Sequence, residues 1–259
     1  MLETSRKQIV RVIVTFSVTV CLAFSGLSRA EAQGERVRLG QFVSPDFFAA
    51  IIFHPKLFKA SALATHVDLS KLEPLAEGEN ADDLKDVQRA LEILNPANVF
   101  RVIVLADPRF GGDDRDLPAF IIQFHEEIDG KEMLEKLFLG MEEAEHAGAT
   151  YYKSTHEKYA KDHTAGHVAG PRTLLMAEEA TLQKMLTKSD APRPLVDKMR
   201  SVSLKHDFIV HFLAEPLFAA AERQGVSADE MISALGDDDA TKTMLKDLRS
   251  LYITFDSTG

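Results

Sequence analysis

Three histidines at short spacing are the residues of this sequence best placed to bind a metal: His156, His163 and His167. The four-residue spacing of His163 and His167 puts both on one face of a helix, as zinc sites use. The intervening Thr164-Ala165-Gly166 favours a strand or loop instead, but alternation along a strand also places them on one face. No H-E-x-x-H pattern is present, so exposed or hydrogen-bonded histidines remain the competing interpretation.

An acidic loop is the second candidate metal site. Asp113, Asp114 and Asp116 follow Asp107 within a few residues, and carboxylate oxygens are the ligands that calcium prefers. Their spacing does not match the calcium loop of EF-hand proteins, and two nearby arginines can neutralise the charge. A solvated hairpin loop is the alternative to a calcium site.

Nucleophilic catalysis has little support in the sequence. Neither the G-x-S-x-G nor the S-x-x-K pattern occurs. Ser154 and His156 are close in the chain, but such adjacency is common and does not define a catalytic pair. Gly111-Gly112 is followed by acids that would repel a phosphate. The sequence therefore assigns no catalytic residue and no cofactor.

The first 32 residues predict a signal peptide. A basic stretch precedes an apolar run of 13 residues, Val12–Phe24, and Ala30-Glu31-Ala32 has the small-x-small pattern of a cleavage site. The run is short for a membrane span, which needs about 20 apolar residues. Cleavage would leave Gln33 as the first residue of an exported, periplasmic or extracellular chain. An uncleaved membrane anchor over residues 9–27 is the alternative.

Cleavage would change the charge and the thiol content of the chain. The whole sequence has 30 basic and 40 acidic residues, a net charge of −10. Removal of four basic and two acidic residues leaves 30 − 4 = 26 and 40 − 2 = 38, a net charge of −12. This charge argues against nucleic acid, and against an anionic membrane surface for the mature chain. Cys21 is the only cysteine, so the mature chain would have no disulfide or thiol chemistry.

Apolar patterning and turn residues predict strands and helices that alternate along the chain after a polar leader, residues 33–41. Asp129 fits the N-cap of one helix. The predicted strands are Phe47–Phe53, Val99–Ala106, Ala119–Phe124, Glu145–His146, Thr150–Lys153, His163–Val168, Thr173–Ala177, Phe208–Ala214 and Leu251–Phe255. The predicted helices are Lys56–Ala64, Ala81–Leu94, Gly130–Met141, Glu179–Lys188, Pro194–Val202 and Thr241–Ser250.

This order predicts an α+β fold with a mainly antiparallel sheet. Several strands are joined by short turns, which parallel strands cannot use. We expect the helices to pack on one face of the sheet. A doubly wound parallel fold is the weaker alternative.

The opening pattern of the chain occurs twice. DFFAAIIFHPKLFKA, residues 46–60, matches DFIVHFLAEPLFAAA, residues 207–221, at an offset of 207 − 46 = 161. A helix and a strand are predicted after each copy, which indicates an internal duplication, although strand–proline–helix junctions also arise independently. We therefore predict an α+β unit over residues 42–205. Residues 206–259 are either an incomplete second copy, in a chain truncated at its C-terminus, or the completion of the first unit's sheet.

Several of these features together resemble a family. They are the signal peptide, the strand–His–Pro–helix opening, the E-H-x-G-x-x-Y-Y turn at Glu145–Tyr152 and the strand G-P-R-T-L-L-M-A-E at Gly170–Glu178. The chain resembles large, uncharacterised exported proteins of planctomycete-type bacteria over most of residues 42–224. The resemblance implies an exported location and a longer parent chain, and it implies no catalytic residue.

The leading interpretation is an exported, non-catalytic protein of the bacterial envelope or periplasm that acts by binding or structural interaction. One alternative is a secreted hydrolase or metal-dependent protein that uses His156, His163 and His167. Another is a calcium-dependent envelope module that uses the loop around Asp113.

Overall fold

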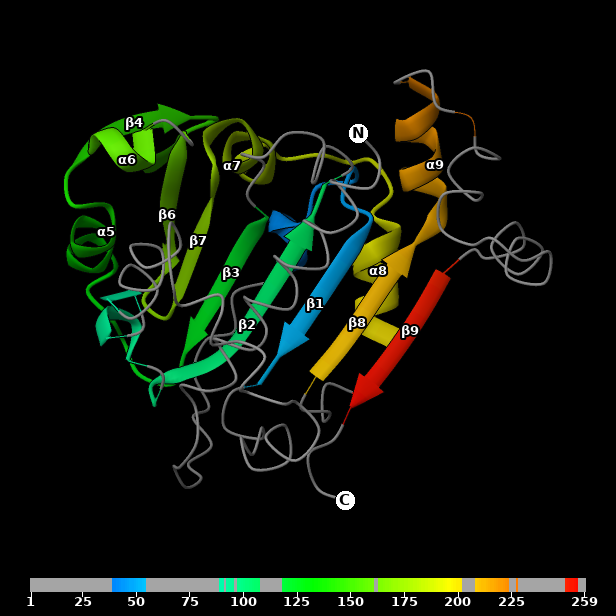
Figure 1. Ribbon diagram of the computed structural model, residues 1–259, viewed down its shortest axis with the longest axis horizontal. Helices are drawn as coiled ribbons and strands as arrows, with labels where there is room; N and C mark the ends of the chain where they lie inside the picture. The colour runs from blue at the N-terminus through cyan, green and yellow to red at the C-terminus, as the bar shows by residue number, and fades with distance from the viewer. Residues whose placement is uncertain are drawn as a thin grey trace, which may run out of the picture.

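Nine strands hydrogen-bond side by side into one sheet in a computed structural model of the chain (Figure 1). The structure describes residues 39–54, 89–90, 92–95, 97–107, 118–160, 163–201, 208–223, 227 and 250–255. The strand order is β4-β5-β6-β7-β3-β2-β1-β8-β9, and every neighbouring pair is antiparallel. The strands are β1 (Ala49–Phe53), β2 (Val99–Ala106), β3 (Ala119–Phe124), β4 (Met141–His146), β5 (Ala149–Ser154), β6 (Thr164–Gly170), β7 (Thr173–Glu178), β8 (Phe208–Leu213) and β9 (Ser250–Phe255).

Short helices accompany the sheet. The described ones are η1 (Leu39–Phe42, a 3-10 turn), α5 (Gly130–Phe138), α6 (Glu157–Ala160), α7 (Glu179–Leu186), α8 (Pro194–Ser201) and α9 (Ala214–Arg223). Residues 89–90 and 92–94 are also helical, as the prediction for Ala81–Leu94 requires at that end. The α+β class and the mainly antiparallel sheet are therefore confirmed.

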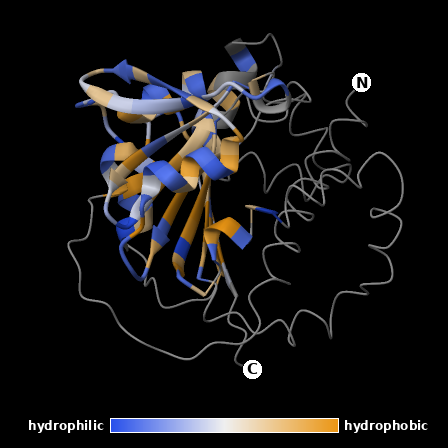
Figure 2. Cartoon of the chain, turned by 90° about the vertical axis from the view of Figure 1, so that its left-hand side faces the viewer, coloured by the Kyte–Doolittle hydropathy of each residue, from blue (hydrophilic) through white to orange (hydrophobic). Residues whose placement is uncertain are grey.

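The expectation that the helices share one face of the sheet is wrong. Adjacent residues of a strand point to opposite faces, and neighbours such as Leu174 and Leu175 are both buried in different clusters. One face packs against η1, α7 and α8, including Leu182 and Leu195. The other face packs against α5, including Leu134, and against the helical residues 90, 93 and 94. Strands buried on both faces, such as β2, β3 and β7, are mostly apolar. Much of the sheet is accordingly hydrophobic in Figure 2.

Most element bounds follow the prediction closely, and the differences have local causes. The helix predicted to reach Met141 ends at Phe138, because Leu139 takes a left-handed conformation (φ 57°) and Met141 begins β4. The polar leader is shorter than predicted, since Leu39–Phe42 forms η1 and buries Phe42. The signal peptide and the predicted helices Lys56–Ala64 and most of Thr241–Ser250 lie outside the described residues.

The two copies of the opening pattern lie side by side in the sheet, as the neighbouring strands β1 and β8. β1 pairs with β2 on one side and with β8 on the other, and β8 pairs with β9. Ala50 lies opposite His211, and these two residues are equivalent under the offset of 161, since 211 − 50 = 161. The order β2-β1-β8-β9 is thus symmetric about one point. It agrees with a duplication, which stays a prediction, and β8 and β9 extend the sheet that residues 42–205 begin.

Gly166 allows α5 to lie close to the sheet. It is buried in β6, and a Cβ atom there would come 2.5 Å from Cδ2 of Leu134 and 3.2 Å from Cζ of Phe138. Both of those side chains are buried in the cluster on this face. Any larger residue at position 166 must push the helix away or distort these side chains.

We predict that Gly166→Val lowers the free energy of unfolding by about 1–3 kcal/mol, the usual cost of overpacking a core. Leu134→Ala alone leaves a cavity and costs about 2–5 kcal/mol. Because the added side chain would fill part of that cavity, the double variant should be more stable than the sum of the two losses implies. Urea unfolding of the four proteins measures this coupling. Strictly additive losses would contradict the close approach of α5 to β6.

Candidate functional site

The three histidines proposed from the sequence do not form one site. His156 and His163 are exposed, on either side of α6. His167 is half-buried in β6, and its Nδ1 lies 2.6 Å from the carbonyl oxygen of Thr150. Burial lowers the pKa of His167, against a smaller opposing effect of that carbonyl. Within the described part of the chain, no three His, Cys, Asp or Glu side chains gather closely enough to hold a metal ion.

The other sequence candidates have structural partners or lie elsewhere. Asp113, Asp114 and Asp116 are outside the described residues, so the calcium hypothesis stays a prediction. Asp107 is buried at the end of β2, and its Oδ2 lies 3.5 Å from Nζ of Lys184 in α7. Ser154 is also buried, and its hydroxyl donates to the carbonyl oxygen of Phe138 at 3.2 Å. That bond ties β5 to the end of α5 and gives Ser154 a structural role.

A polar network that the sequence analysis missed connects β5 to α7. The Tyr151 hydroxyl donates to Oε1 of Glu179 at 2.5 Å, and Gln183 Nε2 donates to the Tyr151 oxygen at 2.9 Å. Lys153 Nζ lies 3.8 Å from the same Glu179 oxygen. Burial, and then the bond to Glu179, raise the pKa of Tyr151. A phenol with a raised pKa stays protonated and keeps its hydrogen bond to Glu179, so the network holds the start of α7 against β5.

This network also explains two of the motifs that carry the family resemblance. Tyr151 belongs to the E-H-x-G-x-x-Y-Y turn, and Glu179 directly follows the strand Gly170–Glu178. One hydrogen bond therefore joins the first motif to the residue that follows the second. Their spacing in the chain gave no signal of this contact, because only the sheet brings β5 near the start of α7.

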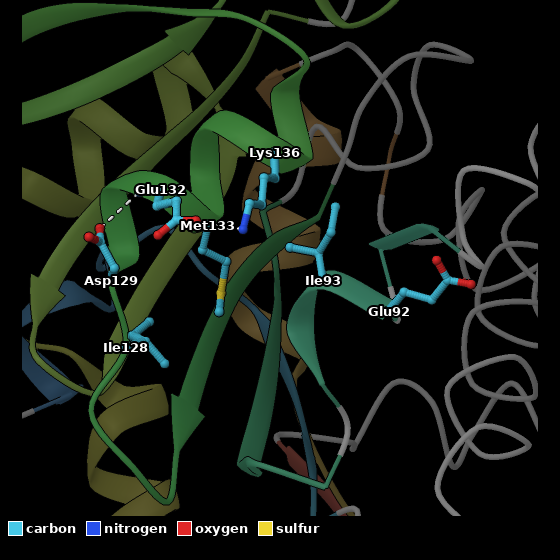
Figure 3. A pocket seen from close by; sticks show the side chains of 7 residues that line it. All are labelled: Glu92, Ile93, Ile128, Asp129, Glu132, Met133 and Lys136. Carbon is cyan, nitrogen blue, oxygen red and sulfur yellow. Dashed lines mark hydrogen bonds and ion pairs between the residues drawn. The ribbon is translucent and has the colours of Figure 1, made fainter.

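A groove of about 410 Å³ lies between α5 and the helical residues 92–93 (Figure 3). Its floor is apolar, from Ile93, Ile128 and Met133. Asp129 Oδ1 accepts a hydrogen bond from the backbone N–H of Glu132, as an N-cap does. The remaining lining residues are Glu92, Glu132 and Lys136.

The polar groups of this groove serve the helix that they belong to. Lys136 Nζ and Glu132 Oε1 are 2.6 Å apart in an i,i+4 ion pair, and the Glu132 hydrogen bond raises the pKa of Lys136. Glu92 points away from the other side chains (Figure 3). Arg89 donates to the carbonyl oxygens of Lys136 and Leu137 and so satisfies the C-terminal end of α5. The groove thus lacks the convergent polar groups of a specific ligand site.

The two edges of the sheet differ strongly in character. β4, at one edge, contains Glu142, Glu143 and Glu145, all of them exposed. Charged side chains on an edge strand discourage pairing with another chain. β9, at the other edge (red in Figure 1), has the sequence SLYITF and no charged residue. Of the two edges, only β9 lacks that protection.

Three consecutive residues of β9 expose large apolar surfaces. Leu251 is 42% exposed, Tyr252 is 43% exposed and Ile253 is 36% exposed. Among the described residues, β8 is the one strand that pairs with β9. Uncharged strands rich in aromatic and β-branched residues have a high tendency to accept a further strand. We therefore take the β9 edge as the candidate binding surface.

A buried histidine lies beneath this edge. His211 of β8 is 3% exposed, on the face that packs against α8, and its ring centroid is 5.0 Å from that of Tyr252. Its Nε2 has no hydrogen-bond partner within the described structure. Burial, and then the positive charge of Lys198, lower the pKa of His211. The folded chain therefore favours the neutral ring.

Comparisons with known proteins show no family. No family model matches the chain, and no curated protein does. Two solved structures have a backbone that is partly similar to that of this chain. "Structure of crystal form I of TP0453" matches with a TM-score of 0.35 and 10% identity over 69% of this chain and 64% of that one. "Structure of crystal form III of TP0453" matches with a TM-score of 0.37 and 12% identity over 85% and 75%.

These similarities are too low to support any functional argument. This chain spans slightly less than two thirds of the length of the first of these proteins. The resemblance to planctomycete-type exported proteins is not among the matches and stays a prediction.

We predict that stability falls below about pH 6.5, the pKa of histidine in an unfolded chain. The folded pKa of His211 is lower than this value, so the unfolded state binds the proton first. The contribution of this group is complete above about pH 6.5 and is lost as the pH falls towards the folded pKa. His167 has a shift of the same sign.

Urea unfolding at about pH 7 and about pH 5 measures this loss. His211→Phe keeps a ring next to Tyr252 but cannot take up a proton. The variant should therefore lose less stability between the two pH values than the unchanged chain. An equal loss in both proteins would mean that His211 does not titrate in this range.

Proposed function

We propose that this chain is an exported, non-catalytic protein of the bacterial envelope or periplasm, and that it acts by binding an extended strand at the β9 edge. In this mode the backbone of the added strand bonds to the open edge, and pockets between side chains provide selectivity. The function rests on one observation: the sheet ends in an uncharged apolar strand on one side and in an acidic strand on the other.

The sequence of β9 supports a role in binding. The alternative is an edge strand that simply lacks features that prevent aggregation. An unprotected edge makes a soluble protein prone to aggregation, and proteins commonly blunt it with charge, proline or a bulge. β4 has three glutamates, whereas SLYITF has neither charge nor proline and its pairing with β8 is regular throughout. An edge of this kind is a template for a further strand, as in complexes that form by strand addition.

The export part of the proposal is supported by the sequence of residues 1–32 and by the lack of cysteine after Cys21. None of the helices in the described ranges is long and apolar enough to cross a membrane. We expect the chain recovered from the bacterial envelope fraction to begin at Gln33 when its N-terminus is sequenced. Recovery of residues 1–32 on the mature, membrane-bound chain would instead support the uncleaved anchor.

A short peptide tests the binding surface directly. The probe is a fluorescent peptide with the sequence of residues 250–255, extended by lysines for solubility. We expect it to bind the purified protein saturably, as measured by fluorescence anisotropy at protein concentrations low enough to limit self-association. Thr254→Pro should abolish binding, because proline removes a backbone donor that points away from β8, towards the added strand.

The matched control is Glu143→Lys, a change on the opposite edge of the same sheet. That variant should bind the peptide as the unchanged protein does. Absence of saturable binding to the unchanged protein, or equal binding to the Thr254→Pro variant, would refute the proposed surface.

A further inference from the structure

The β9 edge is complementary to itself. Leu251 and Ile253 project to the face that also contains Val210 and Phe212 of β8, because these residues are opposite one another in the register. Ser250, Tyr252 and Thr254 project to the other face and all carry a hydroxyl group. The strand therefore has one aliphatic side and one hydroxyl-bearing side.

Resting on the function proposed above, we propose that the strand bound at this edge is β9 of a second copy of the chain. The two strands would pair antiparallel about a two-fold axis at Tyr252. This register places Tyr252 opposite Tyr252 of the second copy, Leu251 opposite its Ile253, and Ser250 opposite its Thr254. The two nine-stranded sheets then continue as a single sheet across the axis.

Each of these cross-strand pairs is of a favourable kind. Aromatic pairs, aliphatic pairs and Ser–Thr pairs each stabilise an antiparallel contact relative to alanine. Because the axis relates the copies, the Leu251–Ile253 pair and the Ser250–Thr254 pair each occur twice. No charged residue occurs within Ser250–Phe255, so no carboxylate or ammonium group of β9 is desolvated.

The asymmetry between the two edges explains why the assembly would stop at two copies. Pairing between two β4 strands would bring Glu142, Glu143 and Glu145 against glutamates of the same sign. Pairing of β4 with β9 would continue from copy to copy into an open fibre, and it would set those carboxylates beside uncharged residues. Pairing of β9 with β9 uses the uncharged edge of each sheet, as far as the structure describes it, and leaves the two acidic edges outside.

The net charge of the chain opposes self-association least at this strand. Two copies with a charge of −10 each repel one another over most of their surfaces. Contact through an uncharged strand adds no like-charge pair within the strand itself. The aliphatic face of β9 also continues that of β8 and of Ile51 in β1, since Ile51 lies opposite Val210, so the joined sheets share one apolar strip.

Sedimentation equilibrium of the purified protein tests the proposal. We expect a mass that rises with concentration towards twice the 28.7 kDa of the chain, or twice the processed mass if export removes residues 1–32.

Leu251→Glu and Ile253→Lys should each raise the dissociation constant about tenfold or more, because each change acts at two symmetric positions. The double variant should recover much of this loss, because the introduced charges of opposite sign face each other across the axis. Glu143→Lys on β4 is the matched control and should leave the dissociation constant unchanged.

A disulfide tests the register independently of these charges. Tyr252→Cys, in a chain that also has Cys21→Ser, places one thiol on each side of the axis. Opposite residues of antiparallel strands have Cα atoms about 4.5–5.5 Å apart, within the range of a disulfide. We expect oxidation to yield a covalent dimer, whereas Glu143→Cys in the same background stays a monomer. Thermal melting of each variant confirms that it is folded.

The outcomes separate this inference from the proposed function. A protein that stays monomeric at all concentrations but still binds the strand peptide refutes the second copy and leaves strand binding intact. A monomer that binds no peptide refutes both. A dimer that tolerates Leu251→Glu and Ile253→Lys, and that forms no disulfide through position 252, uses another surface and also refutes the inference.

Discussion

The sheet depends on β1 and its two sets of backbone hydrogen bonds. β1 pairs with β2 on one side and with β8 on the other, and so it joins residues that are more than 150 positions apart in the chain. Ile52 of β1 and Ile209 of β8 are directly opposite and fully buried. Without this pairing, β8 and β9 would have no place in the sheet, and β9 would not be its edge.

The faces and the edges of the sheet have different functions. The faces form the hydrophobic core, and the edges determine whether another strand can pair with the sheet. Strands such as β7 are apolar on both faces because helices cover both. β4 combines exposed glutamates with ion pairs, such as Lys153 Nζ to Glu142 Oε1 at 2.9 Å, although exposed ion pairs contribute only about 0–1 kcal/mol each. Its main effect is on pairing, since it makes one edge unattractive to another strand. β9 lacks such charges, and this difference makes it the more suitable binding surface.

Local patterns predicted most of the elements. β2 and β3 have the predicted bounds, and Asp129 caps α5, because apolar runs and capping residues act over a few positions. The position of the helices was not predicted correctly. The nearly continuous apolar character of Val99–Ala106 was the available signal, since strands buried on both faces show such runs instead of alternation.

The candidate site was much harder to predict than the fold. His156, His163 and His167 are close in sequence, but α6 and the turn before β6 separate them in space. The hydrogen bond between Tyr151 and Glu179 joins residues 28 positions apart, and only tertiary structure brings them together. The sequence predicted an uncharged strand at Leu251–Phe255. It did not predict that this strand lies at an edge of the sheet, because that position depends on the strand order.

Hydrogen exchange along the backbone tests the central claim most directly. The account places β1 inside the sheet, between β2 and β8, and β9 at an edge. The outer side of β9 pairs only when a further strand is bound. Amides of residues 49–53 should therefore exchange slowly at every protein concentration, whereas those of residues 250–255 should become more protected as the concentration rises. Equal protection of residues 250–255 at low and high concentration, or rapid exchange in residues 49–53, would contradict it.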